Sequence, residues 1–314
     1  MQVCQHKAKQ MFLVGLKWFL FGGLCIFIYY QLSSQFTIDK IVFTERNIGF
    51  WGILGCLGFT LINWWLEILK WHILTISLKL KSFKNSIQEY LIAHAVGVLT
   101  PNKIGEFGVK ILFYPKKHRK KILSRKTWAS FSQMLATLLF GFLGLLFYIL
   151  MQSIIPGLSK AQLFFSFGIT VVFIFIILLE WRYQFIKKSL QARLNFTDII
   201  PLPTKRKIVA LSFARHLVFS HQFVLILMLF EVQISYSHAI CGIWLVYLLA
   251  SIIPQFLFSD ALTKTGFAVV IFSLYSNQQA TIALAVMLMW CLNFVLPTLV
   301  GAILNLLHPY KTTE

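Results

Sequence analysis

Long apolar segments recur along the chain and predict its secondary structure. Each segment has about 20 residues, the length that an α-helix needs to cross the roughly 30 Å hydrocarbon layer of a bilayer. Because that layer offers the backbone no water, each segment is expected to satisfy its own hydrogen bonds as a helix. Six spanning helices are predicted, over residues 12–30, 48–69, 128–150, 163–181, 208–230 and 282–306.

Two further apolar regions contain helix-breaking residues near their middles. Proline removes a backbone donor and glycine weakens a helix, so each region is predicted to form two short helices. We expect each pair to be a re-entrant hairpin that enters and leaves the membrane on one face. The interrupting residues are Pro101, Gly105 and Gly108 within residues 87–112, and Pro254, Asp260, Lys264 and Gly266 within residues 239–276.

An internal repeat is indicated by matching residues that lie 153 positions apart. Pro101 matches Pro254, and the pair Ser82-Phe83 matches Ser235-Tyr236. The span between the two units makes them run in opposite directions. Inverted repeats with broken helices are typical of secondary transporters, whose substrate site lies near the bilayer midplane. The alternative is a chance spacing of two membrane prolines.

Composition agrees with a membrane protein. Hydrophobic residues make up 58% of the chain and charged residues only 12%, and the mean hydropathy is +0.75, which excludes a soluble globular domain. The predicted fold class is therefore an all-α polytopic membrane protein with about six spans and two re-entrant hairpins. It forms a single domain over residues 1–314, with repeat units of about residues 48–151 and 205–307.

Basic residues are concentrated in two loops, which predict the topology. Residues 116–126 contain seven lysines and arginines and no acid, and residues 182–207 contain seven against Asp198 alone. Basic loops remain on the cytoplasmic side, so we expect both termini in the cytoplasm and the chain in the inner membrane of the cell. The net charge of +19 then indicates contacts with anionic lipid headgroups and not with nucleic acid. The five cysteines have no metal-binding spacing, and neither a metal nor a cofactor is predicted.

Three charged side chains follow Pro101 in the first broken region, at membrane depth. On a helix that begins after Pro101, the spacing of Lys103, Glu106 and Lys110 places both lysines within reach of one carboxylate. A freed helix N-terminus here would suit an anion such as a lipid phosphate. The alternative is that Pro101 only turns the hairpin and the lysines extend toward cytoplasmic headgroups.

Other polar residues lie inside predicted spans. Asn63, Glu67 and Lys70 share one helix face, either along a substrate pathway or as a pair that satisfies itself. Arg215 is expected to pair with Asp260, bind a lipid phosphate or extend toward the basic loop, and Asp260 to pair with Lys264. The predicted substrate-binding residues, none of them catalytic, are Thr100, Pro101, Lys103, Gly105, Glu106, Lys110, Glu67, Arg215 and Asp260.

The first broken region also resembles a known family. The residues Thr100, Pro101, Lys103, Gly105, Glu106 and Lys110 look like the first motif of the transmembrane, flippase-type region of lysylphosphatidylglycerol synthases. The resemblance covers roughly residues 7–308, and stand-alone relatives of that region have about this length. The second motif of the family is rich in proline and glycine and ends in an acid. Residues 253–260 keep the proline and the acid but have no paired glycines.

The resemblance and the residues together imply transport of a lipid. No aminoacyl-transferase domain follows Glu314, so lysyl transfer by this chain alone is not expected. We predict a flippase-like translocator of a phospholipid or lipid-linked anionic substrate. One alternative is a membrane-embedded transferase for a lipid or polyprenyl-linked substrate, with Glu106 as base, and another is an accessory scaffold of lipid or envelope synthesis.

Overall fold

A computed structural model describes residues 49–78, 82–98, 100, 103–152, 200–253 and 259–307. The predicted spans at residues 12–30 and 163–181 lie outside the described residues, as do Pro101 and Pro254. Across the described ranges every regular element is helical. This agrees with the predicted all-α class.

Four helices of the described chain are long and apolar enough to cross a membrane. They are α2 (Phe50–Thr75), α5 (Arg119–Gln152), which follows the short η3 (Lys116–His118), α7 (Leu202–Leu229), and the continuous run of α10 (Gln279–Trp290), η4 (Cys291–Val295) and α11 (Leu296–Leu307). They correspond to the four predicted spans that fall in the described ranges. The chain is therefore a helical membrane protein by length and composition.

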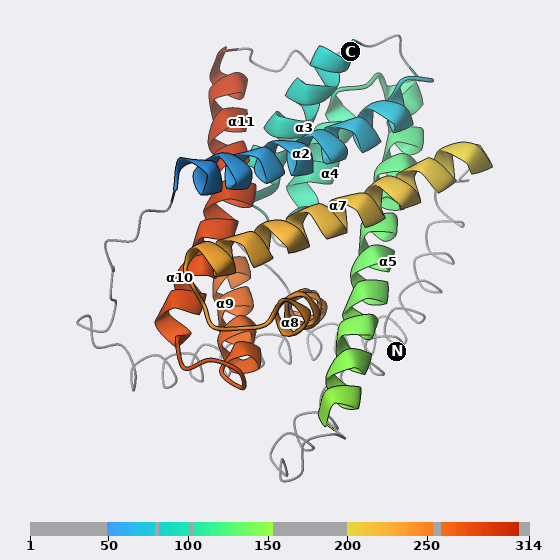
Figure 1. The fold of residues 1–314 in the computed structure, drawn as a ribbon. Coiled ribbons are helices and arrows are strands. Elements are labelled where there is room, and N and C mark those ends of the chain that lie inside the picture. Colours follow the sequence, from blue (N-terminus) through green and yellow to red (C-terminus); the bar gives the residue numbers. More distant parts are fainter. Residues whose placement is uncertain are drawn as a thin grey trace, which may run out of the picture.

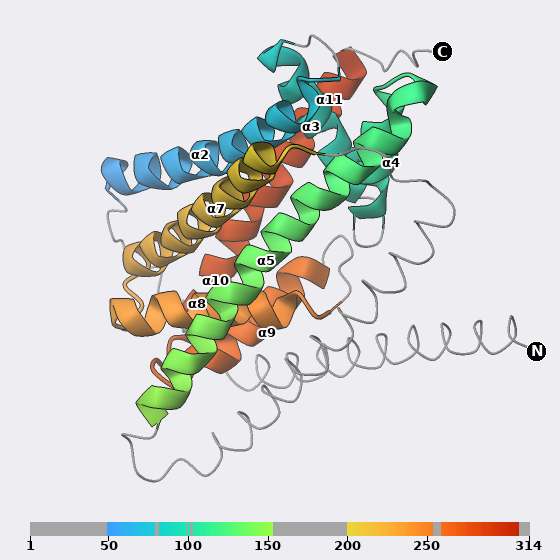
Figure 2. The same cartoon turned by 90° about the vertical axis from the view of Figure 1, so that its right-hand side faces the viewer.

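Each broken apolar region forms two short helices, as predicted. The first gives α3 (Phe83–Val98) and α4 (Ile104–Leu112), and the second gives α8 (Tyr236–Ala250) and α9 (Ser259–Phe272). In both views the α3–α4 pair lies at the upper end of the molecule and the α8–α9 pair at the lower end (Figures 1 and 2). The two pairs thus approach the centre from opposite ends.

Between these pairs, α2 and α7 lie side by side and run in opposite directions (Figure 1). The other long helices each pack against a short helix from the other half of the chain. Helix α5 packs against α8, and α11 packs against α3.

Glycine allows both of these crossings to be close. A Cβ atom at Gly301 of α11 would collide with the carbonyl oxygen of Leu91 in α3. A Cβ atom at Gly144 of α5 would lie 2.6 Å from the carbonyl oxygen of Cys241 in α8. Small residues let helix backbones approach in membranes, where packing replaces the hydrophobic effect between helices. These glycines therefore fix where the short pairs sit.

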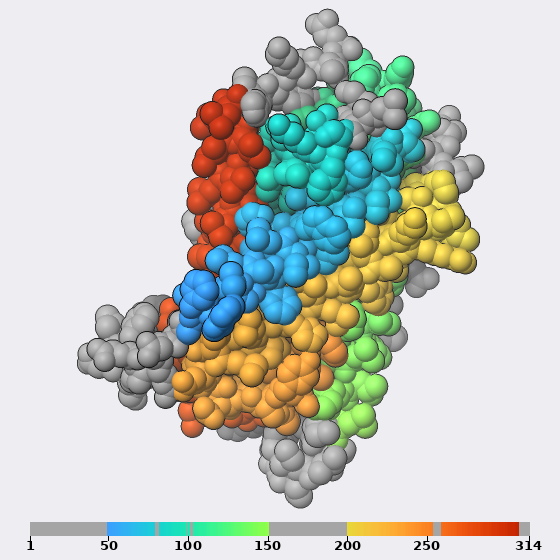
Figure 3. Space-filling view, turned by 45° about the horizontal axis from the view of Figure 1, so that its top comes forward, coloured from blue at the N-terminus to red at the C-terminus, as the bar shows by residue number. Residues whose placement is uncertain are grey.

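The outer surface of α2 is apolar and rich in aromatic side chains. Phe50 and Trp51 are exposed over 71% and 78% of their surface, and Leu61 and Trp65 are also exposed. Figure 3 shows α2 lying on the surface of the molecule, beside α7. In a water-soluble protein such a face would be costly, whereas acyl chains solvate it at no cost. This surface agrees with a lipid-facing helix.

Candidate functional site

The turn between α3 and α4 is held by Thr100 and Gly105. The Thr100 hydroxyl donates to the carbonyl oxygen of Gly97 (2.8 Å) and accepts from the backbone N–H of Gly105 (2.7 Å). A side chain at Gly105 would lie 2.9 Å from that hydroxyl oxygen, so glycine is needed for the close approach. Thr100 and Gly105 therefore shape the turn that positions Lys103.

Lys103 adopts a backbone conformation that is unusual for a residue with a side chain. Its φ of 57° lies in the left-handed region, directly before the first residue of α4. This conformation costs roughly 1–2 kcal/mol for an L-residue, and such costs concentrate at functional positions. It also takes Lys103 off the face of α4 that carries Glu106 and Lys110.

A cavity of about 170 Å³ lies between the two short helix pairs, and Lys103 is part of its wall. Its polar lining comes from five places in the chain: Asn63 on α2, Lys103 before α4, Arg215 on α7, Asp260 and Lys264 on α9, and Asn293 in η4. The apolar lining is Phe219, Phe223, Val246, Tyr247, Val286, Met289, Trp290 and Phe294.

The Lys103 ammonium has no carboxylate within ion-pair distance among the described residues. Its Nζ lies 4.7 Å from the centroid of the Phe294 ring, an arrangement that gives weak cation–π attraction. A lysine at membrane depth normally has a counter-charge. The cavity therefore contains an ammonium group that no described carboxylate contacts directly, and Asp260 lines the same cavity.

Arg215 is fixed at one side of its guanidinium group. Its Nε donates to Asn63 Oδ1 (2.9 Å), and its Nη1 contacts Gln133 Oε1 (3.2 Å) and Glu67 Oε2 (3.1 Å). The structure gives its Nη2 no partner among the described residues. Arg215 also lines the cavity, so its guanidinium group is available to a ligand there.

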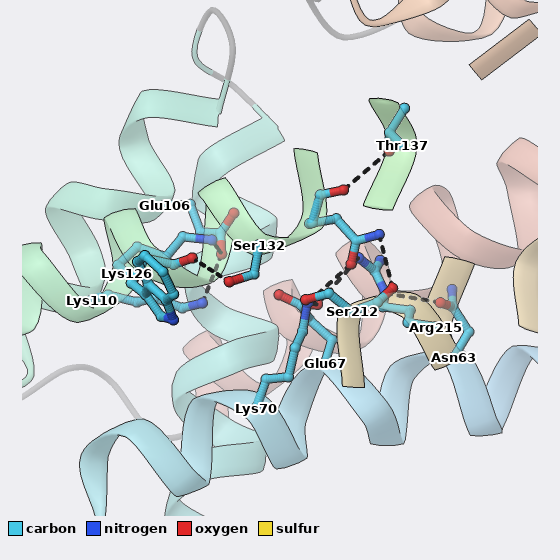
Figure 4. A network of polar contacts seen from close by, with 12 residues as sticks. Asn63, Glu67, Lys70, Glu106, Lys110, Lys126, Ser132, Thr137, Ser212 and Arg215 are labelled. Carbon is cyan, nitrogen blue, oxygen red and sulfur yellow. Dashed lines mark hydrogen bonds and ion pairs between the residues drawn. The ribbon is translucent and has the colours of Figure 1, made fainter. Parts of the chain in front are cut away.

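Two buried ion clusters lie beside the cavity, and Figure 4 shows them together. In the first, Glu67 is 2.6 Å from Lys70, which also donates to Gln133 (3.1 Å) and Ser212 (3.3 Å). This cluster joins α2, α5 and α7, and it holds the carboxylate that orients Arg215.

The second cluster joins α4 to α5. Glu106 Oε1 lies 2.7 Å from both Lys110 and Lys126. The Lys110 ammonium also lies 4.5 Å from the centroid of the Trp71 ring. The Trp71 indole donates to Glu89, which accepts as well from the Tyr114 hydroxyl, both at 2.9 Å. Glu106 thus forms ion pairs with two buried lysines and does not line the cavity.

A chain of amides connects the cavity to the core. Asn63 donates to Asn293 (2.6 Å), Asn293 donates to Gln222 (2.9 Å), and Gln222 donates to Thr60 (2.7 Å). Asn293 lies in the π-helical turn η4. Pro297, four residues later, cannot donate to the Asn293 carbonyl, which explains the local departure from α-helix.

The structure brings the predicted site residues to three places. Lys103, Arg215 and Asp260 line the cavity, whereas Glu67, Glu106 and Lys110 form the ion clusters beside it. Thr100 and Gly105 shape the turn, and Pro101 lies outside the described residues.

Two predicted ion pairs within the short helix pairs are confirmed. They are Glu106–Lys110 at 2.7 Å and Asp260–Lys264 at 2.8 Å. The expected contact between Lys103 and Glu106 is wrong, because Lys103 precedes the helix and does not share its periodicity. Of the alternatives for Arg215, pairing with Asp260 is not observed, and Glu67 takes that place.

Sequence reasoning missed three polar partners. Lys126 was assigned to the basic loop, yet α5 begins at Arg119 and carries Lys126 into the interior. Gln133 and Asn293 are uncharged residues inside apolar spans, and only the proline four residues after Asn293 could have drawn attention to it. Among the described residues, no cluster of three His, Cys, Asp or Glu side chains could hold a metal ion.

Comparisons with known proteins leave the chain without an established relative. No family model matches it, and searches of curated proteins and of solved structures give no match either.

Proposed function

We propose that this chain is a membrane translocator of a phospholipid or lipid-linked substrate with an anionic headgroup. The observation that carries the proposal is the cavity between the two short helix pairs. Lys103, whose ammonium has no ion-pair partner among the described residues, and Arg215 both line it from different elements. An anionic group bound there would supply Lys103 with a direct counter-charge, and a charged side chain at the bilayer centre costs about 2.5 kcal/mol or more.

The proposed architecture is six spans with two re-entrant hairpins in an inverted repeat. In its support, α3 and α8 begin 153 residues apart, at Phe83 and Tyr236. The antiparallel α2–α7 pair and the reciprocal packing of α5 on α8 and α11 on α3 also fit two units of opposite orientation. In this arrangement the two short helix pairs meet near the midplane, where a transporter binds its substrate.

In the proposed mechanism the headgroup exchanges one set of partners for another while its acyl chains remain in lipid. Glu67 already shares its charge between Lys70 and Arg215, and Glu106 shares its charge between Lys110 and Lys126. If a ligand anion binds Arg215 and weakens its contact with Glu67, Glu67 therefore still has Lys70 as its ion-pair partner. Movement of the hairpins against α2 and α7 would then expose the cavity to each leaflet in turn.

The membrane and the topology are part of the proposal. We place the chain in the inner membrane, with both termini and both basic loops in the cytoplasm. The exposed lysines of η3 and the first turns of α5 support contacts with anionic lipid headgroups. The resemblance of Thr100, Lys103, Gly105 and Glu106 to a flippase-type motif supports the same function.

The rival hypothesis of a transferase with Glu106 as base receives less support. Its carboxylate is bound by two lysines and buried, and it does not line the cavity. An enzyme would still form product in detergent, where no leaflets exist. A translocator would act only on movement between leaflets.

The test is leaflet exchange in sealed proteoliposomes that contain phosphatidylglycerol labelled on an acyl chain. Chemical quenching from outside reports the fraction of label in the outer leaflet over time. We expect the native chain to accelerate exchange and Lys103→Gln to slow it at least about tenfold, the effect of losing roughly 1.4 kcal/mol. Lys84→Gln, at an exposed lysine early in α3, should exchange like the native chain. Exchange unchanged by Lys103→Gln would overturn the proposal.

A further inference from the structure

The charge balance around the cavity constrains what its ligand carries. Three cations line the cavity, Lys103, Arg215 and Lys264, against one carboxylate, Asp260. The two clusters beside it add further cations in excess of carboxylates (Figure 4). Together the cavity and the clusters contain the six bases Lys70, Lys103, Lys110, Lys126, Arg215 and Lys264, and the three acids Glu67, Glu106 and Asp260.

The positive charge of the two clusters beside the cavity is shielded from water. Lys70 and Lys110 are each exposed over 1% of their surface and Lys126 over 6%. Among the described residues, the cavity lining by itself has an excess of two positive charges, three cations against one carboxylate. Buried charge is tolerated only when opposite charge or hydrogen bonds compensate it. A ligand with a single negative charge would leave the site cationic.

We infer that the cavity takes a dianionic terminal phosphate group, a phosphomonoester or a diphosphate attached to a lipid, in preference to a phosphodiester headgroup. This inference rests on the proposed function and names its substrate class. Two negative charges match the excess of two positive charges among the described residues that line the cavity. Lys103 supplies a point charge and Arg215 a guanidinium group, the combination that binds phosphate oxygens.

The size and lining of the cavity agree with such a group. Its volume of about 170 Å³ is below the ≈ 300 Å³ at which pockets for drug-sized ligands begin, so a phosphate or diphosphate fits better than a nucleotide. Phe219, Phe223 and Trp290 form an apolar part of the wall that suits the first carbons of a lipid chain. The ligand is thus expected to insert its phosphate end and leave its tail outside.

The experiment compares headgroups at equal lipid background. The purified chain in nanodiscs of zwitterionic lipid is titrated with phosphatidic acid, phosphatidylglycerol, geranylgeranyl diphosphate and inorganic diphosphate at pH 8. We expect phosphatidic acid and geranylgeranyl diphosphate to bind at least tenfold more tightly than phosphatidylglycerol. Equal affinity for phosphatidic acid and phosphatidylglycerol would overturn the inference. Inorganic diphosphate that binds as tightly as geranylgeranyl diphosphate would overturn the lipid part of it.

The pH dependence gives an independent readout. A phosphomonoester has its second pKa near about 6, so phosphatidic acid changes from dianion to monoanion as the pH falls from 8 to 5. Its advantage over phosphatidylglycerol should therefore shrink to less than about threefold at pH 5. The affinity for phosphatidylglycerol itself should stay constant. An advantage that persists at pH 5 contradicts recognition of the second charge.

Variants at Lys103 separate this inference from the proposed function. Lys103→Gln should weaken the binding of phosphatidic acid more than that of phosphatidylglycerol. Lys103→Arg keeps the charge and should retain the preference for phosphatidic acid. The exposed Lys84→Gln variant is the matched control. If Lys103→Gln weakens the binding of both lipids equally and the native chain binds them with equal affinity, the proposed anion site is supported and the preference for a dianion is wrong. If no lipid responds to Lys103→Gln, both proposals fail.

Discussion

The two short helix pairs are built alike but carry different charge. Both consist of two short helices, and both are crossed by a long helix at a glycine. In the α3–α4 pair, Glu106 is clasped by two lysines and Lys103 has no carboxylate partner among the described residues. In the α8–α9 pair, one acid, Asp260, meets one base, Lys264. The two pairs are thus alike in architecture, but Lys103, the cation without a direct carboxylate partner among the described residues, belongs to the α3–α4 side of the cavity. An anion is therefore expected to bind closer to that side.

The sharpest test of this difference is removal of the clasped carboxylate. Glu106→Gln keeps the shape of the side chain but leaves Lys110 and Lys126 buried without a counter-charge, and breaking a buried pair in this way costs about 3–5 kcal/mol. Denaturant unfolding in detergent should show this loss. Adding Lys126→Met should recover part of it, because one buried charge is removed. A loss below about 1 kcal/mol would show that Glu106 is not the centre of the cluster.

The glycine crossings test whether the two pairs are held in the same way. Gly301→Ala places a methyl group against the Leu91 backbone, and Gly144→Ala places one against that of Cys241. Since backbone cannot yield cheaply, overpacking predicts a loss of about 1–3 kcal/mol at each site. Gly58→Ala is the control, with nothing near the added methyl group, and should gain up to about 1 kcal/mol from helix propensity. Thermal stability in detergent measures all three. A stable Gly301→Ala variant would contradict the close α3–α11 approach.

Asp260→Asn should cost less than Glu106→Gln. Lys264 loses its direct ion-pair partner, and that side chain is 24% exposed and lines the cavity, where water or a ligand can solvate it. We expect a loss of about 1 kcal/mol or less, typical of partly exposed pairs. The same change removes a negative charge from the cavity, so an anionic lipid should bind several-fold more tightly. Parallel unfolding and lipid-binding titrations check the two effects, and weaker binding would contradict the proposed anion site.

The smallest effect on stability is expected at Lys103. Lys103→Gly relieves the left-handed conformation, whose cost of roughly 1–2 kcal/mol is offset in part by the greater freedom of glycine when unfolded. Unfolding should therefore show a gain of at most about 1 kcal/mol, while leaflet exchange is lost with the ammonium. A variant that is both destabilised and active would show that Lys103 supports the fold and not the site.

The local chemistry of the hairpins followed from the sequence to a large extent. The Asp260–Lys264 and Glu106–Lys110 pairs are separated by one helical turn, so their spacing alone placed them in contact. The contact predicted for Lys103 failed for a local reason, since periodicity holds only inside a helix and Lys103 lies just before one. The bounds of α3 and α8 also agree with the offset read from Pro101 and Pro254.

Partners from distant segments could not be predicted in this way. Arg215 meets Glu67 across 148 positions of sequence, and Asn63 meets Asn293 across 230. By charge alone, each buried acid could pair with any of several bases, and the sequence contains no local pattern that selects one of them. The packing of α2 against α7 brings Arg215 to Glu67, and Asn293, in its π-helical turn, meets Asn63.

The sequence by itself determined that the chain is a helical membrane protein and where its apolar helices break, because hydrophobicity and helix-breaking residues act locally and every span must satisfy its own backbone. The tertiary structure decided which of the buried ions share a partner and that Lys103 has none among the described residues. These outcomes depend on distances between side chains from different helices, and only the packing of the whole bundle sets those distances.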